Sequence, residues 1–396
     1  MKVTIVSIFF PPEGGAAASR IFNMAKSLQA RGVDVEVITA LPNYPTGKIF
    51  DKYTGSFVVK EEIDGIKCRR YWLYPSNSRN PVLRIWSMIS FSVSMLFALP
   101  HLWSRRPDLL IINSPPLVTG FFAVIMAKFT SAKAVTNISD IWPLSALELG
   151  AIQRGRFYSL LEKIEYFLYK NSYATLTQSQ ETLEHIKALV PTQNLFLYRN
   201  LDEPSPYLEQ GAAYNKTELK IVYAGLLGIA QGVFDICKNV DFRALGVQLH
   251  IYGAGNEWDD IQNYIKTHPD CNIFMNGMIP KRDVPKMLSE FHATLIPLNT
   301  PIYGAFPSKI FMAISSGLPV FFSGGGEGAK VVADYGLGWI NAPADYAVLA
   351  QNIAKFTNLS DTEFKTIKQN CIAASQTDFN REHQTDALLT YLKQLI

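Results

Sequence analysis

Cysteine and charge are both scarce in this sequence, and each scarcity narrows the classes of protein to which it can belong. The cysteines are widely spaced, with no CxxC pair and no histidines at metal-ligand intervals, which excludes a disulfide framework and a zinc cluster. We expect all four, Cys68, Cys237, Cys271 and Cys371, to be reduced core residues. Charged residues make up only 18% of the chain and hydrophobic residues 48%, so the chain is neither disordered nor fibrous.

The N-terminus lacks the features of a secretory signal. MKVTIVSIFF has no basic flank and no small-residue cleavage site, and it runs directly into PPEGG. We interpret this segment as a first β-strand and expect the protein to stay in the cytoplasm.

The length of 396 residues exceeds what one hydrophobic core usually organises, so two domains are expected. In the first half, VTIVSIFF (3–10) and VDVEVITA (33–40) are predicted strands on either side of an amphipathic helix that Gly32 closes. Further strands are predicted at 108–114, 132–139 and 173–179, with helical stretches between them. This alternation indicates βαβ units and a parallel sheet covered on both faces.

The same pattern restarts after a polar, proline-bearing passage at 200–218, which we interpret as a linker. Five apolar runs follow, most of them succeeded by a helical segment: LKIVYAGLLG, VQLHIYGAG, CNIFMNGMIP, ATLIPLN and LPVFFSGGG. The predicted fold class is therefore α/β, with two Rossmann-like, doubly wound parallel-sheet domains facing across a cleft. Ligands of such sheets bind outside the carboxyl ends of the strands, so the cleft is the expected active site.

Positive charge is concentrated in one part of the first domain. From residue 67 to residue 106 the sequence has no acidic residue and seven basic ones: Lys67, Arg69, Arg70, Arg79, Arg84, Arg105 and Arg106. Such a block is either a solvated face or a surface that attracts anionic lipid, nucleic acid or phosphorylated substrate.

An uncharged stretch, IWSMISFSVSMLFALP (85–100), lies inside this block and is shorter than the roughly 20 residues that span a bilayer as a helix. Ser87, Ser90 and Ser94 fall on one face of the predicted helix, and apolar side chains occupy the rest. The alternatives are a core helix, a true span, or a helix lying in the lipid interface, and the basic flanks favour the last. The predicted membrane-surface residues are Arg79, Arg84, Trp86, Phe91, Arg105 and Arg106.

Glycine-rich loops follow several predicted strands. Gly225, Gly228 and Gly232 end the first strand of the second domain, and Gly253 and Gly255 end the next. Loops of this kind let the backbone approach a phosphate, with the next helix supplying amide dipoles, although a tight turn without a ligand has the same sequence. The loop PPEGGAAASR (11–20) offers Gly14, Gly15 and Arg20 for a diphosphate or a sugar.

Two side chains are candidates for the chemistry itself. Asp140 follows a strand and precedes Trp142 and Pro143, where a carboxylate could meet an acceptor hydroxyl. Lys309 lies at a helix start beside Ser308, the expected N-cap, and would add a full charge to the helix terminus, although it could equally be a solvated lysine.

Taken in order, these segments resemble glycosyltransferase family 4. The resemblance rests on the PPEGG loop, RRPDLLIINSPPLVTG, DIWPLSALELG, YAGLLGIAQG, IYGAG and PSKIFMAISSGLPV, and covers nearly the whole chain. It is strongest to the bacterial branch that builds O-antigen, capsule and colanic-acid-like polysaccharides and includes N-acetylfucosamine transferases.

The resemblance implies a GT-B fold with an acceptor-binding domain at 1–200, a nucleotide-sugar-binding domain at 201–378 and a final helix, 379–396, that packs back on the first domain. It also implies retention of the anomeric configuration and no metal or other cofactor, and the sequence has no DxD motif. The implied donor-binding residues are Gly14, Gly15, Arg20, Gly225, Gly228, Gln231, Gly253, Gly255, Ala305, Phe306, Ser308, Lys309 and Glu327.

The sequence also departs from the family pattern. Many members carry two glutamates at the positions of Gly304 and Met312, and a lysine at the position of Gln231. These departures shift the expected chemistry to Lys309, the glycine loops and Asp140, with Glu327 as a further polar contact.

The expected reaction moves a hexose-type sugar from a nucleoside diphosphate sugar, with UDP favoured, to a polyprenyl-diphosphate-linked or other saccharide acceptor. The expected location is the cytoplasmic face of the inner membrane, on an anionic surface, with no nucleic acid as a partner. The alternatives are a sugar-nucleotide epimerase of the same fold and a non-catalytic scaffold derived from a transferase.

Overall fold

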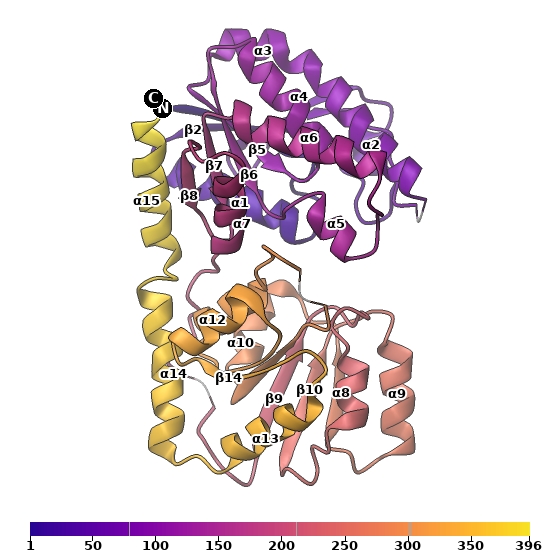
Figure 1. Ribbon diagram of the computed structural model, residues 1–396, viewed down its shortest axis with the longest axis vertical. Coiled ribbons are helices and arrows are strands. Elements are labelled where there is room, and N and C mark those ends of the chain that lie inside the picture. Colours follow the sequence, from indigo (N-terminus) through magenta and orange to yellow (C-terminus); the bar gives the residue numbers. More distant parts are fainter. Residues whose placement is uncertain (79, 211, 301) are drawn as a thin grey trace. The chain divides into compact units, whose positions relative to one another are not determined.

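The computed structural model describes residues 1–78, 80–210, 212–300 and 302–396 (Figure 1). Contacts within the chain divide it into two compact units. Unit 1 comprises Met1–Arg199, Tyr303–Ala305 and Thr385–Ile396, and unit 2 comprises Asn200–Ile302 and Phe306–Gln384.

Unit 1 is built on one twisted sheet. All neighbouring strands are parallel except β3, which forms an antiparallel hairpin with β4. In spatial order the strands are β3 (Val58–Ile63), β4 (Ile66–Tyr71), β2 (Asp34–Ala40), β1 (Lys2–Val6), β5 (Leu109–Ser114), β6 (Lys133–Ile138), β7 (Ala174–Thr177) and β8 (Leu195–Leu197).

Helices cover both faces of this sheet (Figure 1). The helical segments of unit 1 are α1 (Ala16–Ala30), η1 (Asp51–Tyr53), α2 (Pro81–Ser94), η2 (Met95–Ala98), α3 (Leu99–Arg105), α4 (Leu117–Lys128), α5 (Leu144–Glu148), α6 (Arg156–Asn171) and α7 (Gln180–Leu189). One apolar core joins the sheet to α2, α3, α4 and α6, and a second joins its other face to α1 and to the C-terminal helix α15 (Arg381–Gln394).

The last residues of the chain complete the second of these cores. Leu388 and Leu392 of α15 are fully buried against α1 and the sheet, and Tyr391 stacks on Phe196 with ring centroids 4.8 Å apart. Burial of each leucine side chain contributes roughly 1.5–3 kcal/mol. The C-terminal part of α15 is thus integral to unit 1.

Unit 2 contains a second sheet, in which every neighbouring pair of strands is parallel. In spatial order its strands are β11 (Ile273–Gly277), β10 (Val247–Tyr252), β9 (Leu219–Ala224), β12 (Ala293–Pro297), β13 (Val320–Ser323) and β14 (Gly338–Asn341). The order reverses between β9 and β12, which is the switch point at which doubly wound sheets bind ligands.

The helices of unit 2 form two layers around this sheet (Figure 1). On one face lie α8 (Val233–Asn239), α9 (Trp258–Thr267) and α13 (Tyr346–Thr357). The remaining helical segments are η3 (Lys281–Asp283), α10 (Val284–Leu288), α11 (Ser308–Ser315), α12 (Gly326–Asp334) and α14 (Asp361–Gln376). The start of α14 is fixed by a capping box between Ser360 and Glu363.

The predicted fold class, two parallel-sheet α/β domains, is confirmed. The apolar runs predicted as strands are strands, and the free cysteines are as expected, with Cys68, Cys237 and Cys371 buried and Cys271 half-buried. The β3–β4 hairpin and the short edge strands β8 and β14 were not predicted.

Candidate functional site

Two glycine loops meet at the carboxyl ends of β9 and β10 in unit 2. The Gly225 amide donates to the Tyr252 carbonyl at 2.8 Å, and the Leu227 amide donates to the Ala254 carbonyl at 2.9 Å. A Cβ atom on Gly253 would lie 1.8 Å from the Gly225 carbonyl oxygen, and one on Gly255 would lie 2.2 Å from that of Leu227. Packing of one loop on the other therefore explains Gly253 and Gly255 without a ligand.

Gly225 leaves room for a functional side chain instead. It has a φ of +153°, and a Cβ atom there would lie 2.3 Å from the Nζ atom of Lys309. Lys309 is the second residue of α11, and its ammonium group lies 4.1 Å from the centroid of the Tyr223 ring at the end of β9. The fold thus places the ammonium group of Lys309 against the first glycine loop.

The ammonium group of Lys309 lacks an anionic partner. No carboxylate among the described residues lies within 4.0 Å of its Nζ atom, and burial lowers the pKa of Lys309 to about 8. A desolvated cation at a helix start is a favourable place for an anionic ligand, because the charge and the helix dipole act together.

The helix that follows the first glycine loop is not free to bind a phosphate. The carboxylate of Glu257 accepts from the amides of Val233 at 3.0 Å and Phe234 at 3.3 Å, and so caps α8. Gln231, where the family has lysine, lies with its side-chain oxygen 2.9 Å from the Cβ position of Gly228. Glu257 therefore occupies two of the amides that α8 was expected to offer to a phosphate.

The other predicted donor residues lie around α11 and α12, with two corrections. The N-cap of α11 is Pro307, whereas Ser308 is the exposed first residue of the helix and caps nothing, so that prediction was wrong. Ala305 belongs to unit 1, while Phe306 and Lys309 belong to unit 2. Phe306 stacks on Phe311, with ring centroids 4.3 Å apart.

Glu327 is buried in the first turn of α12. The next residue, Gly328, has its Cβ position 3.2 Å from side-chain atoms of Ile310 and Pro307, so the starts of α11 and α12 are adjacent. Glu327 therefore lies near the same helix terminus as Lys309.

Packing also accounts for the two missing glutamates. Gly304 has a φ of +80°, and a Cβ atom there would lie 2.4 Å from Ile141. Its carbonyl accepts from the hydroxyls of Ser179 at 2.6 Å and Thr182 at 3.0 Å, and its amide donates to Glu181 at 2.9 Å. No glutamate fits this position as it is built.

Met312, at the second of these positions, packs as a partly buried hydrophobic residue against a small core that includes Val222 and Leu318. It is an apolar packing residue in unit 2.

In unit 1, predicted residues gather at the carboxyl ends of β6 and β7. Arg20, on α1, donates through Nη1 and, at 3.2 Å, through Nε to the side-chain oxygen of Gln178, which also accepts from Ser139 at 3.2 Å. This is the orientation of the Gln178 carboxamide that satisfies its neighbours. The two strands thus hold the guanidinium group of Arg20 in place.

Asp140 is half-buried beside this cluster and makes no side-chain hydrogen bond to any described residue. Burial raises the pKa of its carboxyl group, and the nearby charge of Arg20 opposes that rise. Gly14 and Gly15 are exposed at the start of α1, where no side chain caps the helix. The site of unit 1 thus combines a fixed cation and an unpaired carboxylate, while the start of α1 has no side-chain cap.

The apolar helix of unit 1 packs with its serine face inward. Ser90 accepts from the Tyr74 amide at 2.7 Å, Ser92 lies 3.1 Å from Thr119, and Ser94 donates to the Trp72 carbonyl. These serine hydroxyls therefore bond to the interior of unit 1 beside the buried Phe91 and Met95, while the hydrophobic residues on another side of the helix are left outside.

Large apolar side chains consequently point away from unit 1 along α2 and η2. Trp86 is 53% exposed and Phe97 65% exposed, and between them lie other exposed or half-buried apolar residues. The exposed apolar stripe, as we call it, consists of Val82, Trp86, Ile89, Val93 and Phe97. Among the described residues, Val82–Arg105 is the helical stretch long and apolar enough to cross a membrane, with a mean hydropathy of 1.7 over its most apolar 18 residues, but 39% of those 18 residues are buried in the structure.

The basic block does not form one surface. Arg70 is fully buried and binds Glu61, while Arg69 and Arg105 pair with the buried Glu36 at 2.9 and 3.2 Å. The prediction of a membrane-surface role is wrong for Arg105, because Asp34 and Glu36 neutralise it, and for Phe91, which is fully buried in the core.

The other predicted membrane-surface residues keep their exposure where the structure describes them. Arg84, Trp86 and Arg106 are exposed, as is Lys67. Arg79 lies outside the described residues.

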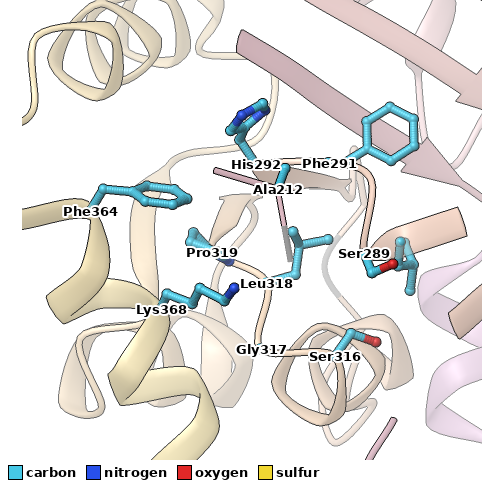
Figure 2. Close-up of a pocket in the computed structure, with 11 residues that line it drawn as sticks. Ala212, Ser289, Phe291, His292, Ser316, Gly317, Leu318, Pro319, Phe364 and Lys368 are labelled. Carbon is cyan, nitrogen blue, oxygen red and sulfur yellow. The ribbon is translucent and has the colours of Figure 1, made fainter. Parts of the chain in front are cut away.

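A small cavity in unit 2 lies at the opposite edge of the sheet from the glycine loops. Figure 2 shows His292, Pro319 and Lys368 around it, close to where β12 and β13 begin. Its volume of about 10 Å³ holds no more than a water molecule. The cavity is therefore no substrate site.

Comparison with known families gives two matches, which meet near residue 200. Residues 15–196 match the family described as Glycosyl transferase 4-like domain, and residues 208–371 match Glycosyl transferases group 1. A curated relative, the putative colanic acid biosynthesis glycosyl transferase WcaI of Escherichia coli K12, is 25% identical over 61% of this chain and 62% of its own length.

Solved structures share the fold over the whole chain. The sucrose-phosphate synthase of Thermosynechococcus elongatus aligns with a TM-score of 0.74 and 14% identity over 100% of this chain and 98% of its own. The E. coli trehalose-6-phosphate structure bound with UDP-2-fluoro glucose aligns with a TM-score of 0.72 and 12% identity over 100% of both chains.

Proposed function

Because the chain belongs to glycosyltransferase family 4 and is a glycosyltransferase of the GT-B fold, we propose that it moves a sugar from a UDP-sugar to a lipid-linked saccharide during surface polysaccharide biosynthesis. The acceptor lipid in this proposal is a polyprenyl diphosphate or a related carrier. The name of the E. coli relative supports the polysaccharide role, and the UDP-sugar in one structural neighbour supports the donor.

The observation that carries the proposal is the unpaired ammonium group of Lys309 against the first glycine loop. When the bond between the anomeric carbon and the β-phosphate oxygen breaks, negative charge develops on the leaving nucleoside diphosphate. A preorganised cation that is already desolvated stabilises this charge without reorganisation. Lys309 is the residue that we assign to this task, with no metal or other cofactor.

Asp140 is assigned to the acceptor. The acceptor hydroxyl oxygen forms the new bond to the anomeric carbon and gives its proton to the leaving β-phosphate oxygen, and a carboxylate without a hydrogen-bond partner can orient that hydroxyl. Retention of the anomeric configuration is part of the proposal through the family, and it puts no demand for a strong base on Asp140.

Substitution of Lys309 tests the donor assignment. We expect Lys309→Ala to reduce transfer by at least about a hundredfold, the loss typical of removing one group that stabilises developing charge. Lys355→Ala, at an exposed lysine of α13, is the matched control and should transfer at the rate of the unchanged protein. Unchanged transfer by a folded Lys309→Ala protein would refute the assignment.

We also propose that the exposed apolar stripe docks on an anionic membrane surface. Four of the five apolar side chains of the stripe are exposed and Ile89 is half-buried, while the serines face the core, and the exposed charged residues within 82–106, Arg84 and Arg106, are both positive. Apolar side chains beside basic residues are typical of helices that lie in the interface of anionic bilayers.

Vesicle flotation tests the membrane proposal. The double variant Trp86→Ser/Phe97→Ser should lose at least about tenfold in binding to vesicles that contain anionic lipid, because each aromatic side chain contributes roughly 1.5–3 kcal/mol on burial. Phe274→Ser, at an exposed phenylalanine of unit 2, is the control. If the unchanged protein stays soluble with anionic vesicles at low salt, the membrane proposal fails.

A further inference from the structure

Gln178 was not among the residues expected to act, yet it lies at the centre of the unit 1 site. It follows β7 directly, and its side-chain oxygen accepts from both Arg20 and Ser139. Ser139 in turn follows β6 and precedes Asp140. The neutral carboxamide of Gln178 thus binds the guanidinium group of Arg20 next to the carboxylate of Asp140.

Charge alone would favour a different arrangement. The guanidinium group of Arg20 interacts electrostatically with Asp140, and a direct ion pair is the usual outcome for two such groups. No ion pair within 4.0 Å joins them in the described structure, because the guanidinium group donates to Gln178 instead. Asp140 consequently keeps its carboxylate oxygens free of partners.

We propose that Gln178 is a positioning residue, which holds Arg20 away from Asp140 so that Asp140 remains available to the acceptor hydroxyl. This inference rests on the proposed function, because it concerns the acceptor side of the same reaction. Without the Gln178 oxygen, Arg20 turns to Asp140, and the resulting ion pair occupies the carboxylate that would otherwise meet the acceptor.

Two substitutions of Gln178 give opposite outcomes. In Gln178→Leu the side chain keeps a similar size but loses the acceptor oxygen, so Arg20 pairs with Asp140 and lowers its pKa by about 1–3 units, as a nearby opposite charge does. In Gln178→Glu the new carboxylate binds Arg20 more strongly and repels Asp140, so the pKa of Asp140 stays or rises. A merely structural role for Gln178 would not produce shifts of opposite sign.

The readout is the pH profile of acceptor-dependent transfer with nucleotide binding measured in parallel. For Gln178→Leu we expect the acidic limb of kcat/KM to move down by about 1 unit or more, and the KM for the acceptor to rise about tenfold, with the KM for the donor unchanged. Gln178→Glu should keep the acceptor KM of the unchanged protein. In the Arg20→Met background, Gln178→Leu should have no further effect, because no guanidinium group remains to move.

The failures of the two proposals are distinguishable. If Gln178→Leu and the unchanged protein share the same acidic limb and the same acceptor KM while Asp140→Asn impairs transfer, the positioning role is refuted and the acceptor assignment stands. If Asp140→Asn transfers normally, the acceptor assignment itself fails, and the positioning role falls with it.

Discussion

Donor binding should take up a proton, because the cation that we assign to the diphosphate is partly neutral before the ligand arrives. Burial lowers the pKa of Lys309 to about 8 in the free protein. A bound diphosphate is an opposite charge and raises that pKa again. The nucleotide complex therefore contains the protonated lysine at every pH near neutrality.

The number of protons taken up on binding follows from the pKa of Lys309 in the free protein. Binding of UDP should take up about 0.1 proton at pH 7, about 0.5 at pH 8 and about 0.9 at pH 9. Below pH 8 the affinity should be nearly constant. Above pH 8 the dissociation constant should rise about tenfold per pH unit, which corresponds to about 1.4 kcal/mol.

Isothermal titration in pairs of buffers with different ionisation enthalpies measures this uptake. Lys309→Met is the reference, because methionine cannot take up a proton, so any uptake that this variant shows on binding UDP comes from the nucleotide or from other residues. We expect the difference between the two proteins to be about half a proton at pH 8. Equal uptake by both proteins, with affinity equally flat up to pH 9, would show that Lys309 does not contact the bound nucleotide.

Three further predictions concern the framework around the sites. Gly225→Ala should weaken nucleotide binding in a folded protein, because its Cβ atom would displace the Lys309 ammonium group from the first glycine loop, and a smaller thermal shift with UDP would detect the loss. Leu388→Ala should lower the free energy of unfolding by about 2–5 kcal/mol in chemical denaturation, because it leaves a cavity under α15. Burial lowers the pKa of His292, so the protein should lose stability as the pH falls below about 6.5, and His292→Gln should reduce that loss.

The controls for these predictions come from the same elements. Gln394→Ala changes an exposed residue of α15 and should leave the unfolding free energy within about 0.5 kcal/mol of its original value. For His292, protonation removes one defined bond, since one ring nitrogen accepts from the Lys220 amide at 3.1 Å and can no longer do so once it carries a proton, while the other nitrogen still donates to the Ala213 carbonyl at 3.0 Å. An unfolding free energy independent of pH between 5 and 7 would contradict the assignment.

The sequence was sufficient for the fold because the central strands of both sheets, such as β5, β12 and β13, are buried on both faces. Each such strand is a continuous apolar run, as in Leu109–Ser114, and the runs alternate with helical patterns. The β3 strand escaped this reasoning, because its burial alternates and its residues 60–62, Lys-Glu-Glu, are charged. It is an edge strand, where charge is common.

The sequence could identify a candidate site residue only where its environment depends on neighbouring residues in the chain. Lys309 could be proposed because a lysine at a helix start adds its charge to the helix terminus in any fold. Arg70 and Arg105 were misjudged because their partners, Glu61, Asp34 and Glu36, reach them through strand pairing and helix packing. The role of Glu257 as the cap of α8 was hidden for the same reason, since the two segments meet only in the folded unit.

The serine face of α2 was visible in the sequence, but its direction was not. Polar residues usually face water, and here they face inward because the loop before α2 presents unpaired backbone groups, among them the Tyr74 amide and the Trp72 carbonyl. Which side of an amphipathic helix is buried depends on such partners.

The composition of unit 1 has a consequence for the order of events on the ribosome. Thr385–Ile396 belongs to this unit, and residues 200–384 are synthesised between it and the rest of the unit. At bacterial and eukaryotic elongation rates that interval lasts roughly 10 to 40 seconds. During it, the groove that Leu388 and Leu392 later fill stays open to water, so the growing chain carries an apolar surface that chaperones can recognise until its final helix closes it.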